Sequence, residues 1–171
     1  MAEITNVECP DRLVMALFSK KNLEKANKKF RNLEFCLDAC DDFLIMGDPE
    51  DELITLAESA GYQVITVQLH SINPDLRGTP VIGNVSGIPC FNYHVPWADP
   101  IFEHPDKKFL VVFYIEEADP RAINALKSII EAHDIQGHRA DNFFVGVICR
   151  DSSKEIQSTI LPLLTRIDWV D

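Results

Sequence analysis

The chain has 171 residues and a mass of 19.3 kDa, which favours a single domain and leaves no room for two full catalytic domains. Acidic residues outnumber basic ones by 27 to 16, and the net charge of -11 argues against general binding to nucleic-acid phosphates. The apolar runs are too short to cross a bilayer, and the first twenty residues lack the basic start and apolar stretch of a signal peptide. We therefore expect a cytoplasmic protein without a membrane anchor.

The first predicted element is an amphipathic helix from 19 to 33, where apolar residues recur at steps of three and four. Its other faces carry six of the sixteen basic residues of the chain: Lys20, Lys21, Lys25, Lys28, Lys29 and Arg31. A solvated helix face is the simpler interpretation of these charges, and contact with an anionic partner is the alternative. We expect residues 1–41 to form an arm with this basic helix, followed by a core from 42 to 171.

Strands and helices alternate through the predicted core. A short apolar run at 43–46 predicts a buried strand, and a helix at 53–60 ends at Gly61. The other predicted strands lie at 62–69, 109–115, 143–149 and 167–170, with a helix from 120 to 133. This order predicts an α/β fold, a three-layer sandwich with a five-stranded, mainly parallel sheet.

The segment from 78 to 105 departs from the strand-helix pattern because it is rich in glycine and proline. Residues 80–89 are typical of two short strands around a turn, which predicts a hairpin insert that projects from the core. The same segment carries four aromatic residues that could supply contact area at an interface: Phe91, Tyr93, Trp97 and Phe102. Some of them will be needed to cover the edge of the sheet.

Five cysteines, an odd number, indicate reduced thiols and not a disulfide framework. Cys36 and Cys40 are four residues apart, as are Cys90 and His94, but no second pair has zinc-finger spacing. We expect no metal and no cofactor. A cysteine and histidine enzyme of unknown reaction is an alternative, with these candidates for nucleophile and base: Cys90, His94, Cys149, His133 and His138.

Three segments resemble parts of the nucleotide-binding core of AAA+ ATPases, and most closely the MoxR-type members common in bacteria and their phages. Residues 73–80 (NPDLRGTP) resemble the segment after the second strand, and residues 118–126 (ADPRAINAL) are similar to the helix that follows the Walker B strand. Residues 162–167 (PLLTRI) resemble the segment before the last core strand. The resemblance covers the chain from about Asp42 to Asp171. It implies an AAA+-like core in which the first strand is central.

The phosphate-binding loop of that family departs from its pattern here. A P-loop needs two glycines whose backbone wraps the phosphates, a lysine, and a hydroxyl that holds magnesium. Residues 47–54 (GDPEDELI) lack the second glycine, the lysine and the hydroxyl, and they place four carboxylates where a polyanion would sit. We therefore expect no ATP binding in the usual manner.

The other catalytic positions are altered as well. Without a gap, Phe113 and Tyr114 stand where Walker B has its acidic pair. A two-residue gap instead brings Glu116 and Glu117 to the strand end, which leaves open whether they bind a metal. Cys149, followed by Arg150 and Asp151, stands at the sensor position. Arg166 stands at the place of the arginine finger, although a surface arginine beside Asp168 is an equal interpretation. The sequence ends after the last predicted core strand, so we expect no helical lid.

These features predict a non-catalytic, protein-binding pseudo-ATPase on an AAA+ scaffold, encoded by a phage or mobile element and active in the bacterial host cytoplasm. It would be an inhibitor or adaptor of a bacterial or phage protein, with a MoxR-type ATPase ring as one candidate. The predicted partner-binding residues are Trp97, Tyr93, Phe91, Phe102, Lys28, Lys29 and Arg166. A residual nucleotide or nucleic-acid binder is the alternative, beside the cysteine and histidine enzyme.

Overall fold

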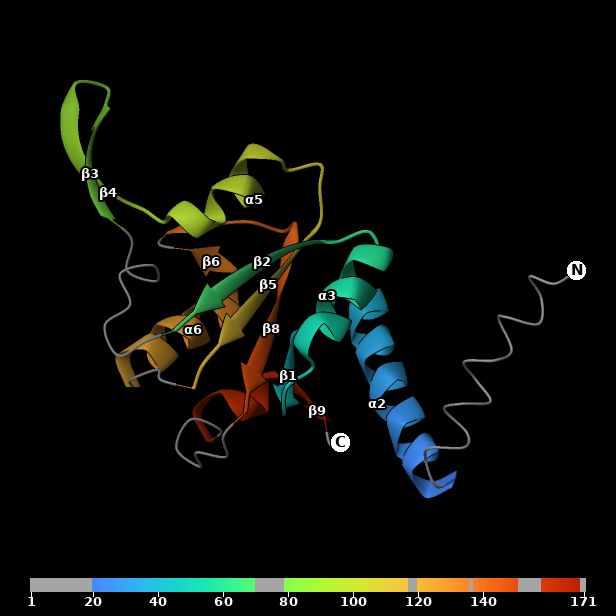
Figure 1. Cartoon of the computed structure of the whole chain (residues 1–171). Helices are drawn as coiled ribbons and strands as arrows, with labels where there is room; N and C mark the ends of the chain where they lie inside the picture. The colour runs from blue at the N-terminus through green and yellow to red at the C-terminus, as the bar shows by residue number, and fades with distance from the viewer. Residues whose placement is uncertain (1–19, 70–78, 117–119, 136, 151–157, 170–171) are drawn as a thin grey trace, which may run out of the picture.

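A computed structural model describes residues 20–69, 79–116, 120–135, 137–150 and 158–169 (Figure 1). Its centre is a five-stranded sheet of β1 (Phe43–Met46), β2 (Gln63–Gln68), β5 (Phe109–Tyr114), β8 (Phe143–Cys149) and β9 (Thr165–Asp168). The strand order is β2-β5-β8-β1-β9, and all four pairings are parallel. The predicted α/β fold with a five-stranded sheet is confirmed.

The position of the first strand differs from the expectation that it is central. β1 lies inside the sheet, hydrogen-bonded to β8 on one side and β9 on the other, but β8 occupies the middle. All seven residues of β8 are buried, as expected for a strand covered on both faces. The last strand covers 165–168 and not the predicted 167–170, because Thr165 is already aligned with Phe43 of β1.

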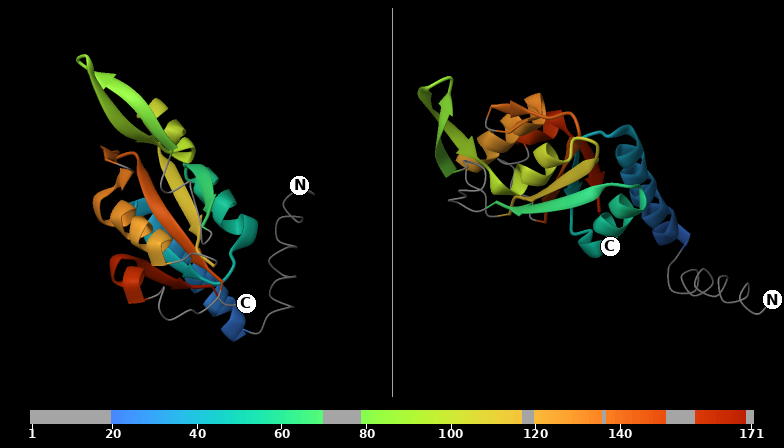
Figure 2. Two further views of the ribbon diagram at one scale, coloured as in Figure 1. Left: turned by 90° about the vertical axis from the view of Figure 1, so that its left-hand side faces the viewer. Right: turned by 90° about the horizontal axis from the view of Figure 1, so that it is seen from above.

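Helices cover both faces of the sheet (Figure 2). Phe43 and Ile45 pack with α2 (Lys20–Ala39) and α3 (Glu50–Ser59), whereas Leu44 between them packs on the opposite side. That opposite side is covered by α6 (Pro120–Ala132), by α5 (Asp99–Glu103) and by the 3-10 turn η1 (Pro96–Ala98). Strand alternation thus supplies two hydrophobic layers, as the three-layer prediction requires.

Helix α2 is six residues longer than the predicted 19–33 at its carboxyl end. Leu33, Cys36 and Leu37 continue the apolar spacing and are fully buried beside Trp169. The chain leaves the helix at Cys40, whose φ of 54° ends the helical path. The boundary predicted at residue 41 thus falls between α2 and β1, and the second half of α2 contributes to the core.

The insert forms a two-stranded hairpin of β3 (Thr79–Val85) and β4 (Ile88–His94) that projects from the body (Figure 1). Val85 and Ile88 face each other across the turn residues Ser86 and Gly87, both with positive φ. This backbone suits a tight two-residue hairpin turn. A second, smaller hairpin of β6 (Asp134–Ile135) and β7 (His138–Arg139) lies just before β8, and a 3-10 turn η2 (Leu161–Leu163) precedes β9.

No helix in the part of the chain that the structure describes is long and apolar enough to cross a membrane.

Candidate functional site

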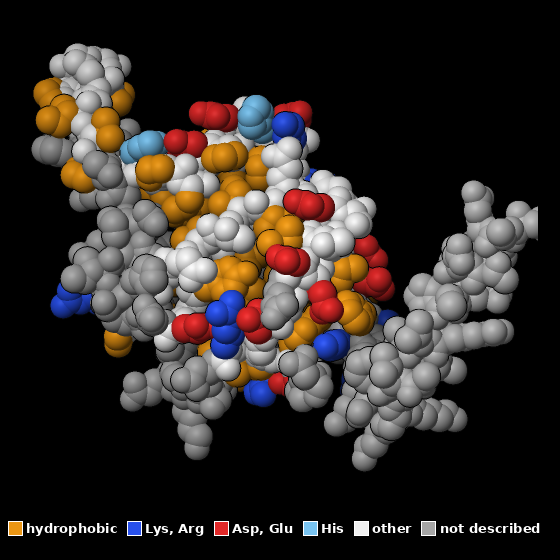
Figure 3. Space-filling model, in the orientation of Figure 1, with side chains coloured by type: hydrophobic (Ala, Val, Ile, Leu, Met, Phe, Trp, Pro, Cys, Tyr) orange, Lys and Arg blue, Asp and Glu red, His pale blue; other side chains and the backbone are white. Residues whose placement is uncertain are grey.

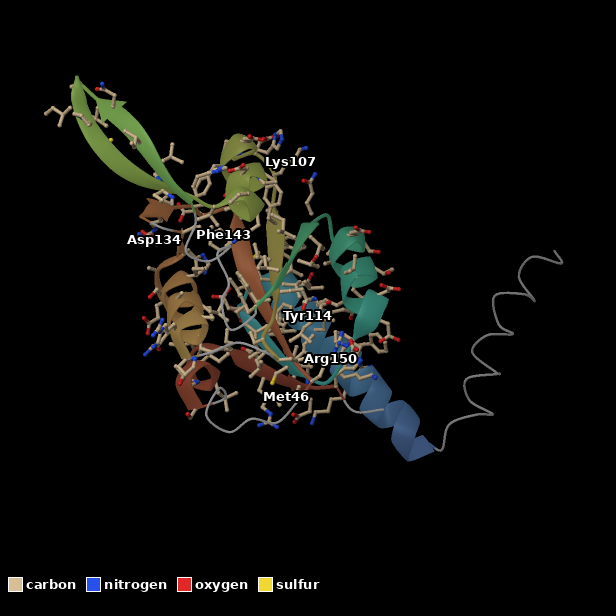
Figure 4. All side chains as sticks on the ribbon, turned by 60° about the vertical axis from the view of Figure 1, so that its left-hand side comes forward. Met46, Lys107, Tyr114, Asp134, Phe143 and Arg150 are labelled. Carbon is tan, nitrogen blue, oxygen red and sulfur yellow. The ribbon has the colours of Figure 1, made fainter. Side chains whose placement is uncertain are left out.

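Parallel α/β sheets bind ligands in the crevice outside the carboxyl ends of their strands. In this chain Gly47 follows β1, Glu116 lies just beyond β5, and Arg150 follows β8. Figure 4 shows Tyr114 and Arg150 close together at the same end of the sheet as Met46, with Phe143 at the other end. The position at which an AAA+-like core would bind a nucleotide is therefore lined by Gly47, Tyr114, Glu116 and Arg150.

Arg150 connects the ends of three strands at this position. Its Nε lies 2.9 Å from Oδ2 of Asp48 and 3.1 Å from Oε1 of Glu116, within ion-pair distance of both. Its guanidinium carbon also lies 5.6 Å from the centre of the Tyr114 ring. One protein cation thus neutralises two carboxylates and stacks on an aromatic ring, an arrangement that suits the planar guanidinium better than lysine.

Burial and the same charges shift the pKa of the Tyr114 hydroxyl. Burial raises the pKa of Tyr114 above its usual value, and the nearby carboxylates, chiefly Asp48, raise the pKa further, while Arg150 opposes them. The side chain therefore stays a neutral phenol at physiological pH. It offers a hydroxyl at the crevice and no negative charge.

The connection from β1 to α3 has only three residues, 47–49. Gly47 has a φ of 132°, and a Cβ at this position would collide with the Trp169 carbonyl oxygen. The Gly47 N–H donates to the carbonyl of Cys149 at 3.0 Å, and the Trp169 N–H donates to the carbonyl of Met46 at 2.8 Å. The glycine thus serves packing against the last strand, and its N–H is already used within the protein.

The acidic residues predicted to repel phosphate have a structural role. Asp51 and Glu52 lie in the first turn of α3, where carboxylates stabilise the positive end of the helix dipole. A helix start is the usual anion site in nucleotide-binding loops, but here the protein's own carboxylates lie at it. The residues present do not fit a nucleotide phosphate with its magnesium ion, because Arg150 already pairs with Asp48 and Glu116.

The two alternatives for Walker B are placed differently by the structure. Phe113 is fully buried in the core, and Tyr114 lies against Arg150. Glu116 lies at the strand end and pairs with Arg150, whereas Glu117 falls outside the described residues. Within the described ranges, no three His, Cys, Asp or Glu side chains are grouped closely enough to hold a metal ion.

Arg166, at the place of the arginine finger, lies on the edge strand β9. Its Nε donates to Oδ1 of Asp168 at 2.8 Å, and both side chains are half-exposed. The two residues are two positions apart on one strand and so share a face. Arg166 therefore forms the surface pair with Asp168 that was the alternative interpretation of its role. Its contact with a partner subunit stays a prediction.

The four predicted aromatic contact residues separate into distinct environments. Trp97 is half-buried and packs edge-on against Phe113, with 5.5 Å between ring centres. Phe102 is exposed and lies 5.9 Å from the His138 ring. Phe91 and Tyr93 belong to β4, but their side chains are outside the described part of the chain.

The two lysines singled out on α2 also differ. Lys28 is exposed to solvent. The ammonium of Lys29 lies 4.5 Å from the centre of the Trp169 ring, which also packs edge-on with Phe30 at 5.3 Å. Lys29 therefore contributes a cation–π contact that joins α2 to the end of β9, while Lys28 remains available to a partner.

The residues of the cysteine and histidine alternative are only partly brought together: His94 and His138 line one cavity, whereas Cys149 and His133 lie elsewhere. Cys149 is buried in β8, and His133 donates to Asp42 at 3.2 Å. His94 donates to both oxygens of Asp99, at 2.8 and 2.9 Å. Each of these two histidines thus hydrogen-bonds a carboxylate, and Cys90, on the same face of β4 as His94, is half-buried.

The aliphatic residues of the hairpin were not among the predicted contact residues. Val81, Val85, Ile88 and Ile82 are exposed by 45%, 62%, 69% and 74% respectively. Residues 79–94 contain no Asp, Glu, Lys or Arg, and this charge-free stretch was the signal that could have identified the surface. Figure 3 shows the hydrophobic side chains of the hairpin standing apart from the body.

Comparison with known proteins shows a likeness of fold to solved structures. No family model matches the chain, and no protein of curated function matches it. The fold is similar to a crystal structure from Cytophaga hutchinsonii, described as a predicted ATPase, with a TM-score of 0.55 and 13% sequence identity. The match covers 89% of this chain and 50% of the other, so this chain spans about half the length of the solved structure. Together with the parallel sheet, the likeness supports an AAA+-like fold.

Proposed function

We propose that this chain is a non-catalytic, protein-binding module on an AAA+-like core. The observation that carries the proposal is the projecting hairpin, where Val81, Ile82, Val85 and Ile88 are exposed and no charged residue is present. Soluble proteins seldom leave a contiguous apolar surface open to water unless it binds something. The hairpin is therefore the primary docking element.

Docking by the faces of the hairpin is favoured over addition of a strand to its edges. Each strand carries one proline, Pro80 in β3 and Pro89 in β4. Proline is accommodated in strands where its nitrogen faces away from the ladder, so each outer edge lacks one donor. The side chains on the faces then supply most of the contact with a partner.

The absence of catalysis is part of the same proposal. Arg150 holds Asp48 and Glu116 at the carboxyl end of the sheet, and Gly47 packs against Trp169 in place of a phosphate-cradling loop. A nucleotide would have to break these contacts and lie beside the carboxylates of Asp51 and Glu52. This arrangement supports a scaffold that has lost ATP hydrolysis.

The resemblance of residues 73–80, 118–126 and 162–167 to MoxR-type ATPases refines the proposal. We place the chain as a degenerate relative of that group, encoded by a phage or mobile element and active in the bacterial cytoplasm. Its role is that of an inhibitor or adaptor of a bacterial or phage protein. A ring of a MoxR-type ATPase is one candidate target, in which Arg166 would lie at the subunit boundary.

Site-specific photo-crosslinking tests the docking element. A photoreactive residue replaces Ile88 at the hairpin tip, and the same residue replaces the exposed Glu58 on α3 as a matched control. We expect a discrete crosslinked protein from the Ile88 position that is lost in a Val85→Ser variant of the same chain. An identical product from the Glu58 position, or one that persists after Val85→Ser, would refute docking through the hairpin.

Isothermal titration with ATP and magnesium tests the loss of catalysis. We expect no binding heat and no phosphate release from the full chain. Micromolar affinity would contradict the proposal and would support the alignment in which Glu116 and Glu117 bind a metal.

A further inference from the structure

A cavity of about 640 Å³ lies where the base of the hairpin meets α5 and the strands β6 and β7. It is at the amino ends of β5 and β8, opposite the end that carries Arg150. In Figure 4, Asp134, which adjoins the lining residue Ile135, and Phe143 mark this end of the sheet, whereas Arg150 marks the other. The volume is within the range of roughly 300 to 1,000 Å³ that is typical of ligand pockets.

The apolar lining comes from four separate parts of the chain. Val81 belongs to β3, Val95 follows β4, Phe102 belongs to α5, and Ile135 belongs to β6. Figure 3 shows hydrophobic side chains on the body beside the base of the hairpin. Phe102 is exposed by 41%, so a large aromatic face is open to an occupant.

One carboxylate and two imidazoles supply the polar part of the lining. Asp99 accepts hydrogen bonds from Nε2 of His94, yet its side chain remains partly open to solvent. His138 is the second imidazole, and the lining contains no Lys or Arg. Because the chain also has a net charge of -11, the electrostatic complement of this cavity is a basic group.

One face of the hairpin leads from the cavity-lining residue Val81 toward the hairpin tip. Val81 and Val85 are four residues apart on β3, and Ile88 is the cross-strand neighbour of Val85. Strand alternation places all three side chains on the same face, while Ile82 points to the opposite face. An extended apolar segment can therefore begin in the cavity and follow the hairpin toward its tip.

We infer that this cavity and the adjoining hairpin face bind an extended segment of a partner protein in which apolar side chains adjoin a Lys or Arg. The basic group lies at Asp99 and the Phe102 ring, where the carboxylate and the aromatic face both attract a cation. The apolar side chains contact Val81, Val95 and Ile135. This inference rests on the proposed protein-binding function and specifies the chemistry of the partner.

Selection from a phage-displayed library of random 12-residue peptides on the full chain tests the inference. We expect enriched peptides to combine apolar residues with at least one Lys or Arg. The Asp99→Asn variant retains a hydrogen-bond acceptor for His94 but removes the charge, and we expect about a tenfold loss of affinity for these peptides. Phe102→Ala should cause a similar loss, of about tenfold or more.

Glu58→Gln is the matched control for Asp99→Asn, because it removes one exposed carboxylate from α3, which packs on the other face of the sheet. Its affinity for the selected peptides should stay within about twofold of the parent chain. Enrichment of acidic peptides, failure to enrich any peptide, or equal binding to Asp99→Asn and Phe102→Ala would overturn the inference. Crosslinking from Ile88 that persists in those cases would leave the proposed protein-binding function standing.

Discussion

Nε2 of His133 donates to Oδ2 of Asp42 at 3.2 Å, although 91 residues separate the two in the sequence. The other oxygen of Asp42 accepts a hydrogen bond from the Val145 N–H at 2.8 Å. His133 lies just after α6, Asp42 just before β1, and Val145 in β8. One carboxylate thus fixes the end of a helix to the starts of two neighbouring strands.

This pair makes stability depend on pH. The hydrogen bond to Asp42 is the main cause that raises the pKa of His133, and burial opposes it. Because the folded-state pKa lies above the unfolded value of about 6.5, the stabilisation is complete below that pH. It is lost as pH rises through the folded-state pKa. We expect the pair to contribute about 1 kcal/mol at pH 5.5 and much less at pH 8.5.

Urea unfolding at several pH values measures this contribution. His133→Asn is a suitable variant because asparagine tolerates the positive φ of 49° found at this position. Asp42→Asn removes the charge and retains an acceptor for the Val145 N–H. Both variants should show a flatter dependence of unfolding free energy on pH between 5.5 and 8.5. A parent-minus-variant difference that grows with pH would contradict the assignment.

Gly47 should tolerate no side chain. Gly47→Ala combines an unfavourable φ with a collision against Trp169, and we expect a loss of about 3 kcal/mol or more in unfolding free energy. Gly61→Ala is the control, since Gly61 also has a positive φ of 90° but nothing within 4 Å of the added carbon. That control should lose about 1 to 2 kcal/mol. Equal losses in denaturant titrations would disprove the steric role of Trp169.

Replacement of Arg150 by Met should destabilise the protein because Asp48 and Glu116 lose their shared cation. All three side chains are partly exposed, so solvent screening limits the expected loss to about 1 kcal/mol. The loss should shrink between 0.05 and 1 M NaCl, as solvent ions screen the two carboxylates. Arg150→Lys retains the charge and should lose less. A salt-independent loss in thermal unfolding would assign Arg150 a packing role instead.

Lys29 and Lys28 should give opposite results in two assays. We expect Lys29→Gln to lower unfolding free energy by about 0.5 to 1 kcal/mol through the lost contact with Trp169, while Lys28→Gln has no measurable effect. If α2 also meets an anionic partner, Lys28→Glu should slow association in a salt-sensitive manner. Stopped-flow association with the partner protein that crosslinking identifies provides that second measurement. Equal stability losses for the two glutamine variants would exclude the cation–π contact.

Trp97 was predicted to be an interface anchor, and its packing on Phe113 adds a role in the fold. We expect Trp97→Ala to lower unfolding free energy by about 2 to 3 kcal/mol, with a smaller loss for Trp97→Phe. Partner affinity is therefore compared between the parent and Trp97→Phe, which keeps an aromatic ring on Phe113. A Trp97→Ala chain as stable as the parent would show that the edge-on contact contributes nothing.

The sequence by itself determined the central strands. The runs at 43–46 and 143–149 match β1 and β8 residue for residue, because strands buried on both faces must be apolar throughout. The run at 109–115 predicts β5 for the same reason and exceeds it by one residue at the carboxyl end. The extension of α2 to Ala39 was missed, although Cys36 and Leu37 continue its apolar spacing.

Only the tertiary structure decided how the candidate sites are assembled. Asp48, Glu116 and Arg150 come from segments far apart in the chain, and no spacing in the sequence relates them. Parallel strand pairing brings their carboxyl ends to one edge, where the cation and the two carboxylates meet. The exposure of Ile82 and Ile88 was likewise hidden, since an apolar strand has the same sequence whether its face is covered or open to solvent.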